Sequence, residues 1–321
     1  MRLGLFTPIF NDLSFPELLD ELKHFPQITM LEIGTGGWPG ASHLQLDMLI
    51  DNRKSVTEYL ARLADAGLGI SALSCHGNPV HPNESIARRD AVLLEKTIRL
   101  AGQMQVPNVV TFSGCPGGGA EDRTPNWIVA AWPTEYSEAL EWQWNERLIP
   151  FWRTAAKSAA GSGVRIALEA HPGFSVYNPA SLLRLRDAVG PEIGMNLDPS
   201  HLWWQGMDIP AVIGILGGAI FHFHAKDVFL HAGRIECNGV LDIKSYRRLE
   251  QRSWSFRTVG WGHSEYMWKE IVSALRLSGY DYVLSIEHED ALVSKREGLT
   301  SAIGMLSRFL LQEPPAESWW I

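Results

Sequence analysis

The chain has 321 residues, of which 45% are hydrophobic and 20% charged, and its formal net charge at pH 7 is -8. This composition is typical of a globular enzyme with a large core, and the acidic balance argues against a nucleic-acid partner because phosphate binding needs a basic surface. No apolar run reaches the ~20 residues that a membrane span requires, and we expect no signal peptide because the N-terminal segment lacks a long apolar stretch. Three scattered cysteines are too few for a disulfide framework, so a reducing, cytoplasmic setting is expected.

Short apolar, β-branched runs alternate with amphipathic segments along the whole chain. The amphipathic segments include residues 55–67, 84–104 and 263–279, where apolar side chains recur at helical spacing. Strands that alternate with helices indicate βαβ units and a parallel sheet. The predicted strands cover residues 2–7, 28–34, 68–77, 108–114, 164–171, 192–201, 219–227 and 282–290.

Eight such units in a chain of this length predict a closed (β/α)₈ TIM barrel. A doubly wound open sheet is the alternative, but it would carry a glycine-rich phosphate turn after the first strand, where this sequence has FTPIFND. We therefore expect one barrel domain over residues 1–312 and a C-terminal tail over 313–321.

Two long segments interrupt the regular alternation. Residues 115–136 follow the fourth predicted strand, and residues 228–262 follow the seventh. Both segments leave the carboxyl ends of strands, the face where barrel active sites lie. Long loops at that face serve more often as lids or binding walls than as linkers.

Four consecutive strands, the fifth to the eighth, each end in a potential metal ligand. These residues are Glu169, Asp198, His224 and Glu287. In a closed barrel the four strand ends lie along one part of the rim, where three carboxylates would repel and raise one another's pKa values. A divalent cation removes that conflict, and an oxygen-rich ligand set with one imidazole favours Mn²⁺, with Mg²⁺, Co²⁺ and Zn²⁺ as alternatives. Strand capping or pairing with Lys or Arg explains any one of these residues equally well, but explains four in succession poorly.

With these motifs in view, the sequence resembles the xylose-isomerase-like sugar isomerases and epimerases, whose superfamily also contains abasic-site nucleases of the endonuclease IV type. The resemblance runs from the first strand to about Leu310 and is strongest at LEAHPG, NLDPSH, HFHAKD and VGWGHSEYMWKEIVSALRLSGYDYVLSIEHED. It implies that the four residues named above bind one divalent metal, commonly Mn²⁺. It also implies that Glu169 and Glu287 move a proton between carbons next to a sugar carbonyl, through a metal-stabilised enediolate.

Several further side chains near the strand ends are candidates for substrate binding. His201 can hydrogen-bond a substrate oxygen or orient a ligand carboxylate, and His76 ends the third predicted strand. Lys226 can touch substrate or pair with its neighbour, and Arg257 can reach into the site from the long loop. Trp38 offers an aromatic face for the C–H face of a sugar. We assign no catalytic role to His288, Glu289 and Asp290.

We therefore expect a metal-dependent sugar isomerase or epimerase with a small carbohydrate substrate, no nucleic-acid or membrane partner, and a rim rich enough in tryptophan to support a homo-oligomer. A lyase or dehydratase acting on an oxidised (keto) sugar with the same site is the main alternative, because the same enolate can expel a leaving group β to it. The chain departs from the epimerases it resembles in its long loop after the seventh strand and in lacking their glutamate just downstream of Glu169, where it has HPGFSVYN, and both departures bear on the substrate. An endonuclease IV-like nuclease is less favoured, since the fourth strand, NVVTFSGC, offers no histidine and residues 228–242 contain no Asp-x-His element. A barrel that binds sugar and metal without turnover is a third alternative.

Overall fold

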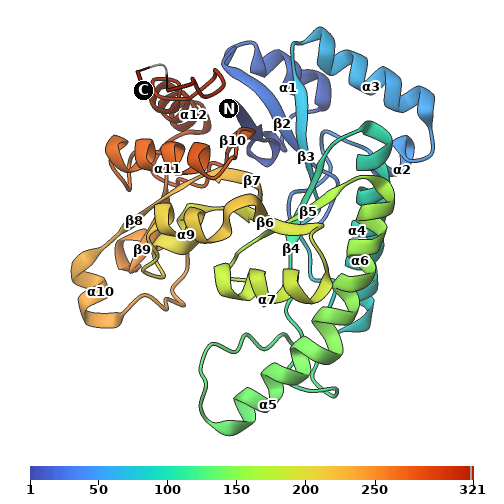
Figure 1. Cartoon of the computed structure of the whole chain (residues 1–321), viewed down its shortest axis with the longest axis vertical. Helices are drawn as coiled ribbons and strands as arrows, with labels where there is room; N and C mark the ends of the chain where they lie inside the picture. Colours follow the sequence, from blue (N-terminus) through green and yellow to red (C-terminus); the bar gives the residue numbers. More distant parts are fainter. Residues whose placement is uncertain (319) are drawn as a thin grey trace.

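The computed structural model describes residues 1–318 and 320–321, and its centre is a closed barrel of eight parallel strands (Figure 1). The first strand pairs with the last, with Arg2 beside Val283 and Leu5 beside Ile286, so the sheet is closed and the open-sheet alternative is wrong. The strands are β1 (Arg2–Phe6), β2 (Ile28–Gly34), β3 (Gly69–Ser74), β4 (Asn108–Phe112), β5 (Arg165–Glu169), β6 (Ile193–Leu197), β7 (Ile220–Ala225) and β10 (Val283–Ile286).

The order of the strands around the barrel follows the order of the chain. β5, β6, β7 and β10 are therefore consecutive neighbours, joined in parallel register. Because all eight strands run the same way, the carboxyl ends of these four strands lie along one continuous part of the rim.

Helices surround the barrel and cover its outer face (Figure 1). The longer ones are α1 (Phe15–Leu22), α3 (Arg53–Asp65), α4 (Glu84–Met104), α6 (Ile149–Ser162), α7 (Pro179–Val189), α9 (Ile209–Leu216), α11 (Glu265–Leu277) and α12 (Lys295–Leu306). The helix predicted over 84–104 has these same bounds. The helix predicted over 55–67 begins earlier because the Asn52 side chain accepts a hydrogen bond from the Ser55 amide, which places its first turn at Arg53. No helix of the described residues is long and apolar enough to cross a membrane.

Seven of the eight strands are shorter than the sequence predicts, and the two that lose most residues lie at the candidate site. The strand predicted over 192–201 ends at Leu197, because the Asp198 carboxylate accepts a hydrogen bond from the Ser200 amide and caps a short helix, α8 (Pro199–Trp203). The strand predicted over 282–290 ends at Ile286, and residues 287–290 continue without regular structure. In both cases the polar residues after the strand leave the sheet and approach the mouth of the barrel.

The two long segments differ in structure. Residues 115–133 are largely irregular and lead into α5 (Thr134–Trp142), which continues through a π-helical turn, Gln143–Leu148, into α6. The second segment forms a two-stranded antiparallel sheet from β8 (Asp227–Leu230) and β9 (Trp254–Arg257), with α10 (Ala232–Asn238) and a long loop between them. The buried Asp227 carboxylate accepts hydrogen bonds from the backbone amides of Gly260, Gly262 and His263, and so anchors this segment beside the rim.

Candidate metal centre and active site

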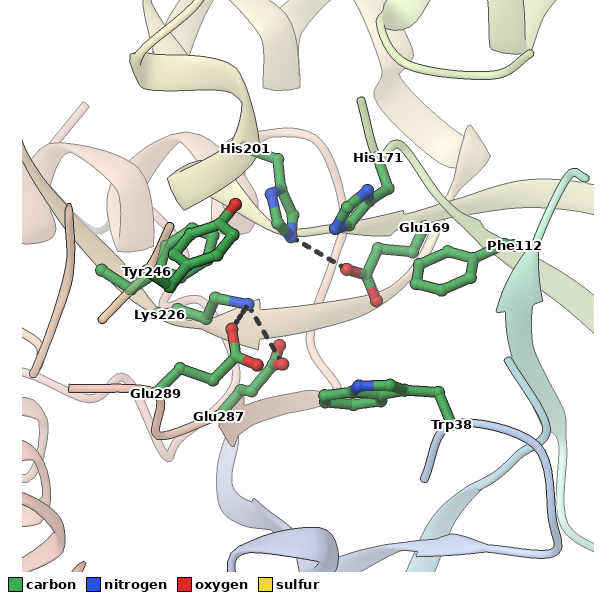
Figure 2. Close-up of a pocket in the computed structure, with 10 residues that line it drawn as sticks. Trp38, Phe112, Glu169, His171, His201, Lys226, Tyr246, Glu287 and Glu289 are labelled. Carbon is green, nitrogen blue, oxygen red and sulfur yellow. Dashed lines mark ion pairs between the residues drawn. The ribbon is translucent and has the colours of Figure 1, made fainter. Parts of the chain in front are cut away.

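A cavity of about 450 Å³ opens at the carboxyl ends of the strands (Figure 2). It is lined by ionisable groups and by aromatic rings. Its lining consists of Trp38, Phe112, Glu169, His171, His201, Lys226, Tyr246, Phe256, Glu287 and Glu289. A mainly apolar hollow with a few convergent polar groups is the usual form of a small-molecule site.

The four predicted metal ligands converge at the floor of this cavity. Glu169 is the last residue of β5, Asp198 follows β6, His224 lies in β7 and Glu287 follows β10. One potential ligand atom from each lies within 4.8 Å of the other three, and all four residues are buried. The His224 Nδ1 atom is 2.8 Å from Glu287 Oε2 and 3.5 Å from Glu169 Oε2. The fold thus brings together side chains that are far apart in the sequence.

The unpaired atoms of this cluster indicate what it can hold. Among the described residues, Asp198 Oδ2, His224 Nδ1 and Glu287 Oε2 are buried and have no partner with hydrogen-bond geometry. Buried polar atoms without partners are costly. A divalent cation among them would remove that cost, and carboxylate oxygens with one imidazole nitrogen suit such an ion. The residues present therefore fit a divalent metal.

Lys226 gives this cluster a positive charge of its own. Its Nζ lies 2.8 Å from Glu289 Oε2, 3.1 Å from Glu287 Oε1 and 3.3 Å from Asp198 Oδ2. Burial by itself would lower the pKa of Lys226, but the carboxylates of Glu287, Glu289 and Asp198 outweigh burial and raise it well above its ordinary value. Lys226 is therefore a buried ammonium group that points into the cavity (Figure 2).

The three carboxylates differ in their affinity for protons. Burial raises the pKa of Asp198 to about 7, although Lys226 opposes the shift. Burial would also raise the pKa of Glu287, but Lys226 and His224 lower it to about 2. The pKa of Glu169 is lowered well below its ordinary value because His201 and His76 outweigh its burial. Asp198 is thus the carboxylate that holds a proton near neutral pH when no cation is bound.

Three histidines surround Glu169. His76 Nε2 is 3.0 Å from Glu169 Oε2, and His201 Nε2 is 3.1 Å from Glu169 Oε1 and 3.3 Å from Asp198 Oδ2. The His171 ring lies 4.0 Å from the His201 ring, and its Nδ1 donates to the Pro172 carbonyl oxygen, which leaves Nε2 as an acceptor when the ring is neutral. Burial lowers the pKa of His201 to about 3, so its ring is neutral at pH 7.

Of the predicted substrate-binding residues, some line the cavity and others do not. His201, Trp38 and Lys226 line the cavity, and His76 lies directly behind Glu169. Arg257 does not belong to the lining formed by the described residues: its Nε donates to Asp290 Oδ2 at 2.9 Å, and its guanidinium group lies 5.5 Å from the centre of the Trp261 ring. The reason is local, because β9 ends at Arg257 beside the segment that follows β10.

Other residues of the site were not found from the sequence. Glu289 lines the cavity, but residues 287–290 lie beyond the end of β10, so strand alternation could not predict the direction of its side chain. Glu32 is a fully buried carboxylate within β2 whose Oε2 accepts from His224 Nε2 at 2.8 Å, and its signal was a charged residue inside an apolar run. Tyr246 and Phe256 reach the cavity from the second long segment, where no periodic pattern fixed their position.

The protein is thus a closed parallel barrel with a potential metal centre, made of buried carboxylates and histidines, at the carboxyl ends of its strands. The chain belongs to the xylose isomerase-like TIM barrel family, whose model matches residues 31–309. A relative, the uncharacterized protein YfiH of Bacillus subtilis (strain 168), is 37% identical over 315 residues, which is 97% of this chain and 100% of YfiH.

Solved structures share the fold at low sequence identity. The probable 3-DHS dehydratase AsbF of Bacillus anthracis is 19% identical with a TM-score of 0.67, and the match covers 96% of this chain and 99% of AsbF. The IolI protein with a bound zinc atom is 18% identical with a TM-score of 0.64, over 97% of this chain and 99% of IolI. An L-ribulose 3-epimerase is 19% identical with a TM-score of 0.59, over 94% of this chain and 86% of the epimerase. At these identities the likeness is one of fold.

Proposed function

We propose that this protein is a divalent-metal-dependent isomerase or epimerase of a sugar or sugar derivative. One observation carries the proposal. Potential ligand atoms of Glu169, Asp198, His224 and Glu287 converge at the floor of a cavity with aromatic walls, and several of these atoms have no hydrogen-bond partner. The fold it shares with a zinc-bound protein and with a sugar epimerase supports the same class of chemistry.

Glu169, Asp198, His224 and Glu287 would hold the cation, favoured as Mn²⁺, which supplies positive charge for a substrate oxygen that becomes negative during the reaction. Glu169 and Glu287 point into the cavity from β5 and from the end of β10 (Figure 2). Both have lowered pKa values, so both are ionised at neutral pH and can accept a proton from a substrate carbon next to a carbonyl group. One carboxylate takes the proton on one face of the substrate, and the other can return a proton on the opposite face.

The remaining groups hold the substrate in position. His201, neutral at pH 7, can hydrogen-bond a substrate oxygen beside Glu169 and Asp198. Trp38 and Phe112 on one side, and Tyr246 and Phe256 on the other, offer aromatic faces to the C–H groups of a sugar.

Proton exchange with solvent tests the proposal directly. The protein, stripped of metal and reloaded with Mn²⁺, is incubated in D₂O with ketoses, 3-keto-sugars and inosose-like polyols, and the products are followed by NMR. We expect deuterium to enter at the carbon next to the carbonyl of at least one substrate, with an isomer or epimer as the product. A metal-loaded protein that exchanges no proton in any of these compounds would contradict the proposal.

A dehydratase acting on a keto sugar is the second candidate, and Lys226 is the observation that favours it. Loss of a hydroxyl group next to the abstracted proton places negative charge on the departing oxygen, and the buried ammonium of Lys226, in the same cavity as Glu287, can donate a hydrogen bond to that oxygen. The fold shared with AsbF, described as a probable dehydratase, is compatible with this reaction. Mass spectrometry separates the two candidates, because a dehydratase product has lost one water and an isomerase product has the mass of its substrate. A nuclease gains no support, since β4 presents Phe112 to the cavity where that alternative needs a histidine.

A further inference from the structure

Glu32 is a charged side chain at a place where a charge is expensive. It lies within β2, is fully buried and faces the interior of the barrel below the cavity. A buried carboxylate costs several kcal/mol unless other groups satisfy it. Ser74 from β3 donates to its Oε1 at 2.5 Å, and Ser285 from β10 and His224 from β7 donate to its Oε2 at 3.0 and 2.8 Å. Three other strands therefore supply donors to this one carboxylate.

We propose that Glu32 is a positioning residue of the metal centre, which fixes the ring nitrogen that His224 presents to the cation and places a negative charge behind that ring. This inference rests on the proposed metal dependence. Neither the sequence motifs nor the cavity lining includes Glu32.

The direction of the hydrogen bond carries the argument. A carboxylate accepts, so the 2.8 Å contact between His224 Nε2 and Glu32 Oε2 requires a proton on Nε2. In a neutral ring the lone pair is then on Nδ1, which is the nitrogen that lies 2.8 Å from Glu287 Oε2 and 3.5 Å from Glu169 Oε2. Without Glu32 the ring can take the other form, with Nδ1–H donating to Glu287. That form has its lone pair on Nε2, which faces Glu32, and none on the nitrogen that faces the cation site.

A histidine that binds metal through one nitrogen and donates to a carboxylate through the other is held in one orientation and is the more basic ligand. Glu32 meets both conditions, because its own position is fixed by Ser74 and Ser285. Among the described ionisable groups, Glu32 contacts His224 and lies near His222, whose Nδ1 is 3.8 Å away. Its effect on the centre therefore passes through His224.

A second cation held by Glu32, His222 and His224 is the competing interpretation, since these residues also lie within ligand reach of one another. The hydrogen bonds favour the positioning role. Both oxygens of Glu32 have donors, and His222 Nδ1 is 2.9 Å from Asn196 Oδ1, whereas the unpartnered atoms lie on the other side of the His224 ring. One cation is therefore expected, on the Nδ1 side.

Metal titration of the full-length protein tests the proposal. The metal-free protein and its variants are titrated with Mn²⁺ and with Zn²⁺ by calorimetry. We expect one equivalent to bind to the unmodified protein, and Glu32→Gln to weaken binding by roughly 10- to 100-fold. Glu32→Asp, which keeps the charge on a shorter side chain, should recover part of the affinity. Asp90→Asn is the matched control, because Asp90 is also buried but accepts hydrogen bonds from the Asn78 amide and Arg89 rather than from a candidate metal ligand. The metal affinity of this variant should stay within about twofold of that of the unmodified protein.

A spectroscopic measurement separates positioning from a loss of structure. In ¹⁵N-histidine-labelled, Zn²⁺-loaded protein, we expect the His224 resonances to show a proton on Nε2 and none on Nδ1, and Glu32→Leu to remove the hydrogen-bonded Nε2 proton signal. Circular dichroism shows whether Glu32→Gln folds. If it does not, the double variant Ser74→Ala with Ser285→Ala is used instead, because it removes two donors to Glu32 and leaves the hydrogen bond to His224. This variant should weaken metal binding to a smaller degree.

The outcomes distinguish this inference from the proposed function. An unmodified protein that binds neither metal overturns the metal-dependent function and this inference with it. An unmodified protein that binds one equivalent, while a folded Glu32→Gln variant binds equally tightly, overturns the positioning role alone. Two equivalents per chain, reduced to one by Glu32→Gln, would replace that role with a second metal site.

Discussion

The rim of the barrel has two halves with different chemistry. The half formed by β5, β6, β7 and β10 carries the ionisable groups of the candidate metal centre. The half formed by β1 to β4 carries rings instead: Phe6 lies 6.0 Å from Trp38 and 5.8 Å from His76, and His76 lies 4.5 Å from Phe112. The ionisable groups that line the cavity therefore lie on one half of the rim and face the rings of Trp38 and Phe112, while Tyr246 and Phe256 flank Lys226 from the second long segment.

This division suggests how the two halves contribute to activity. An aromatic wall lowers the local dielectric constant, which strengthens the electrostatic interactions of the charged half. The aromatic wall also contacts the substrate, and these contacts are the same in the ground state and in the transition state. We therefore expect changes in the charged half to lower kcat, and changes in the aromatic half to raise KM.

The largest expected effect comes from the two glutamates of the charged half. Glu169→Gln and Glu287→Gln each remove a carboxylate that can accept a proton, so each should lower the rate of deuterium exchange by about 10²- to 10⁴-fold. Glu289→Gln is the matched control, because Glu289 lines the same cavity and pairs with Lys226 but is not one of the four convergent ligands. Exchange that survives at the normal rate in either of the first two variants would remove that glutamate from the acid/base pair.

The pH dependence of metal binding should be the next largest effect. Because burial raises the pKa of Asp198 to about 7, a proton competes with the cation below that pH. Metal affinity should fall by roughly tenfold for each pH unit below 7 if one proton is displaced, as calorimetry between pH 5.5 and about 8 would show.

Asp198 also makes the stability of the metal-free protein depend on pH. Its pKa is raised on folding, so its contribution to stability is fully present below its ordinary pKa of 3.8 and is lost as the pH rises through about 7. A bound cation offsets this loss because it stabilises the charged carboxylate. The rise in Tm on adding Mn²⁺ should therefore be larger at about pH 8 than at about pH 5.5, and an equal rise at both pH values would show that Asp198 does not take up a proton in this range.

A moderate effect is expected in the aromatic half. Trp38→Ala removes a ring that lines the cavity and is 55% exposed, so little of the core should be disturbed. Because this ring contacts the substrate equally before and during the reaction, we expect KM to rise several-fold while kcat changes by less than about twofold. A fall in kcat with unchanged KM would show that the two halves are not divided as described.

The smallest effect on activity should come from Arg257, which the sequence suggested as a substrate contact. Because Arg257 pairs with Asp290 outside the cavity lining of the described residues, Arg257→Gln should leave KM unchanged within about twofold and lower the free energy of unfolding by about 1 kcal/mol. Steady-state kinetics and denaturant unfolding provide the two values. A large increase in KM with normal stability would restore its role in substrate binding.

The sequence predicts the barrel well because its information is local and repeated. Each apolar run followed by an amphipathic segment specifies one βα unit, and chain-order closure then brings Glu169, Asp198, His224 and Glu287 together without any further information. The ends of strands are predicted less well. Asp198 stops β6 through a side-chain hydrogen bond to the Ser200 amide, which a hydrophobic pattern does not contain.

The rest of the site depends on contacts between distant segments. Glu32 is meaningful only because the barrel places it against His224, which lies 192 residues away along the chain. Phe256 reaches the cavity from β9, which pairs with β8, and Tyr246 reaches it from the loop between these strands and stacks on Phe256 with ring centres 5.8 Å apart. Neither arrangement has a periodic signature in the sequence.

Anomalous diffraction from crystals grown with Mn²⁺ tests the central claim most directly. The account predicts one strong peak per chain, within about 2.0–2.6 Å of oxygen atoms of Glu169, Asp198 and Glu287 and of His224 Nδ1, with Glu32 still bonded to Nε2 of the same ring. Contradiction would come from a cavity with no peak, in which Lys226 alone bridges Asp198 and Glu287, or from a peak bound elsewhere on the barrel.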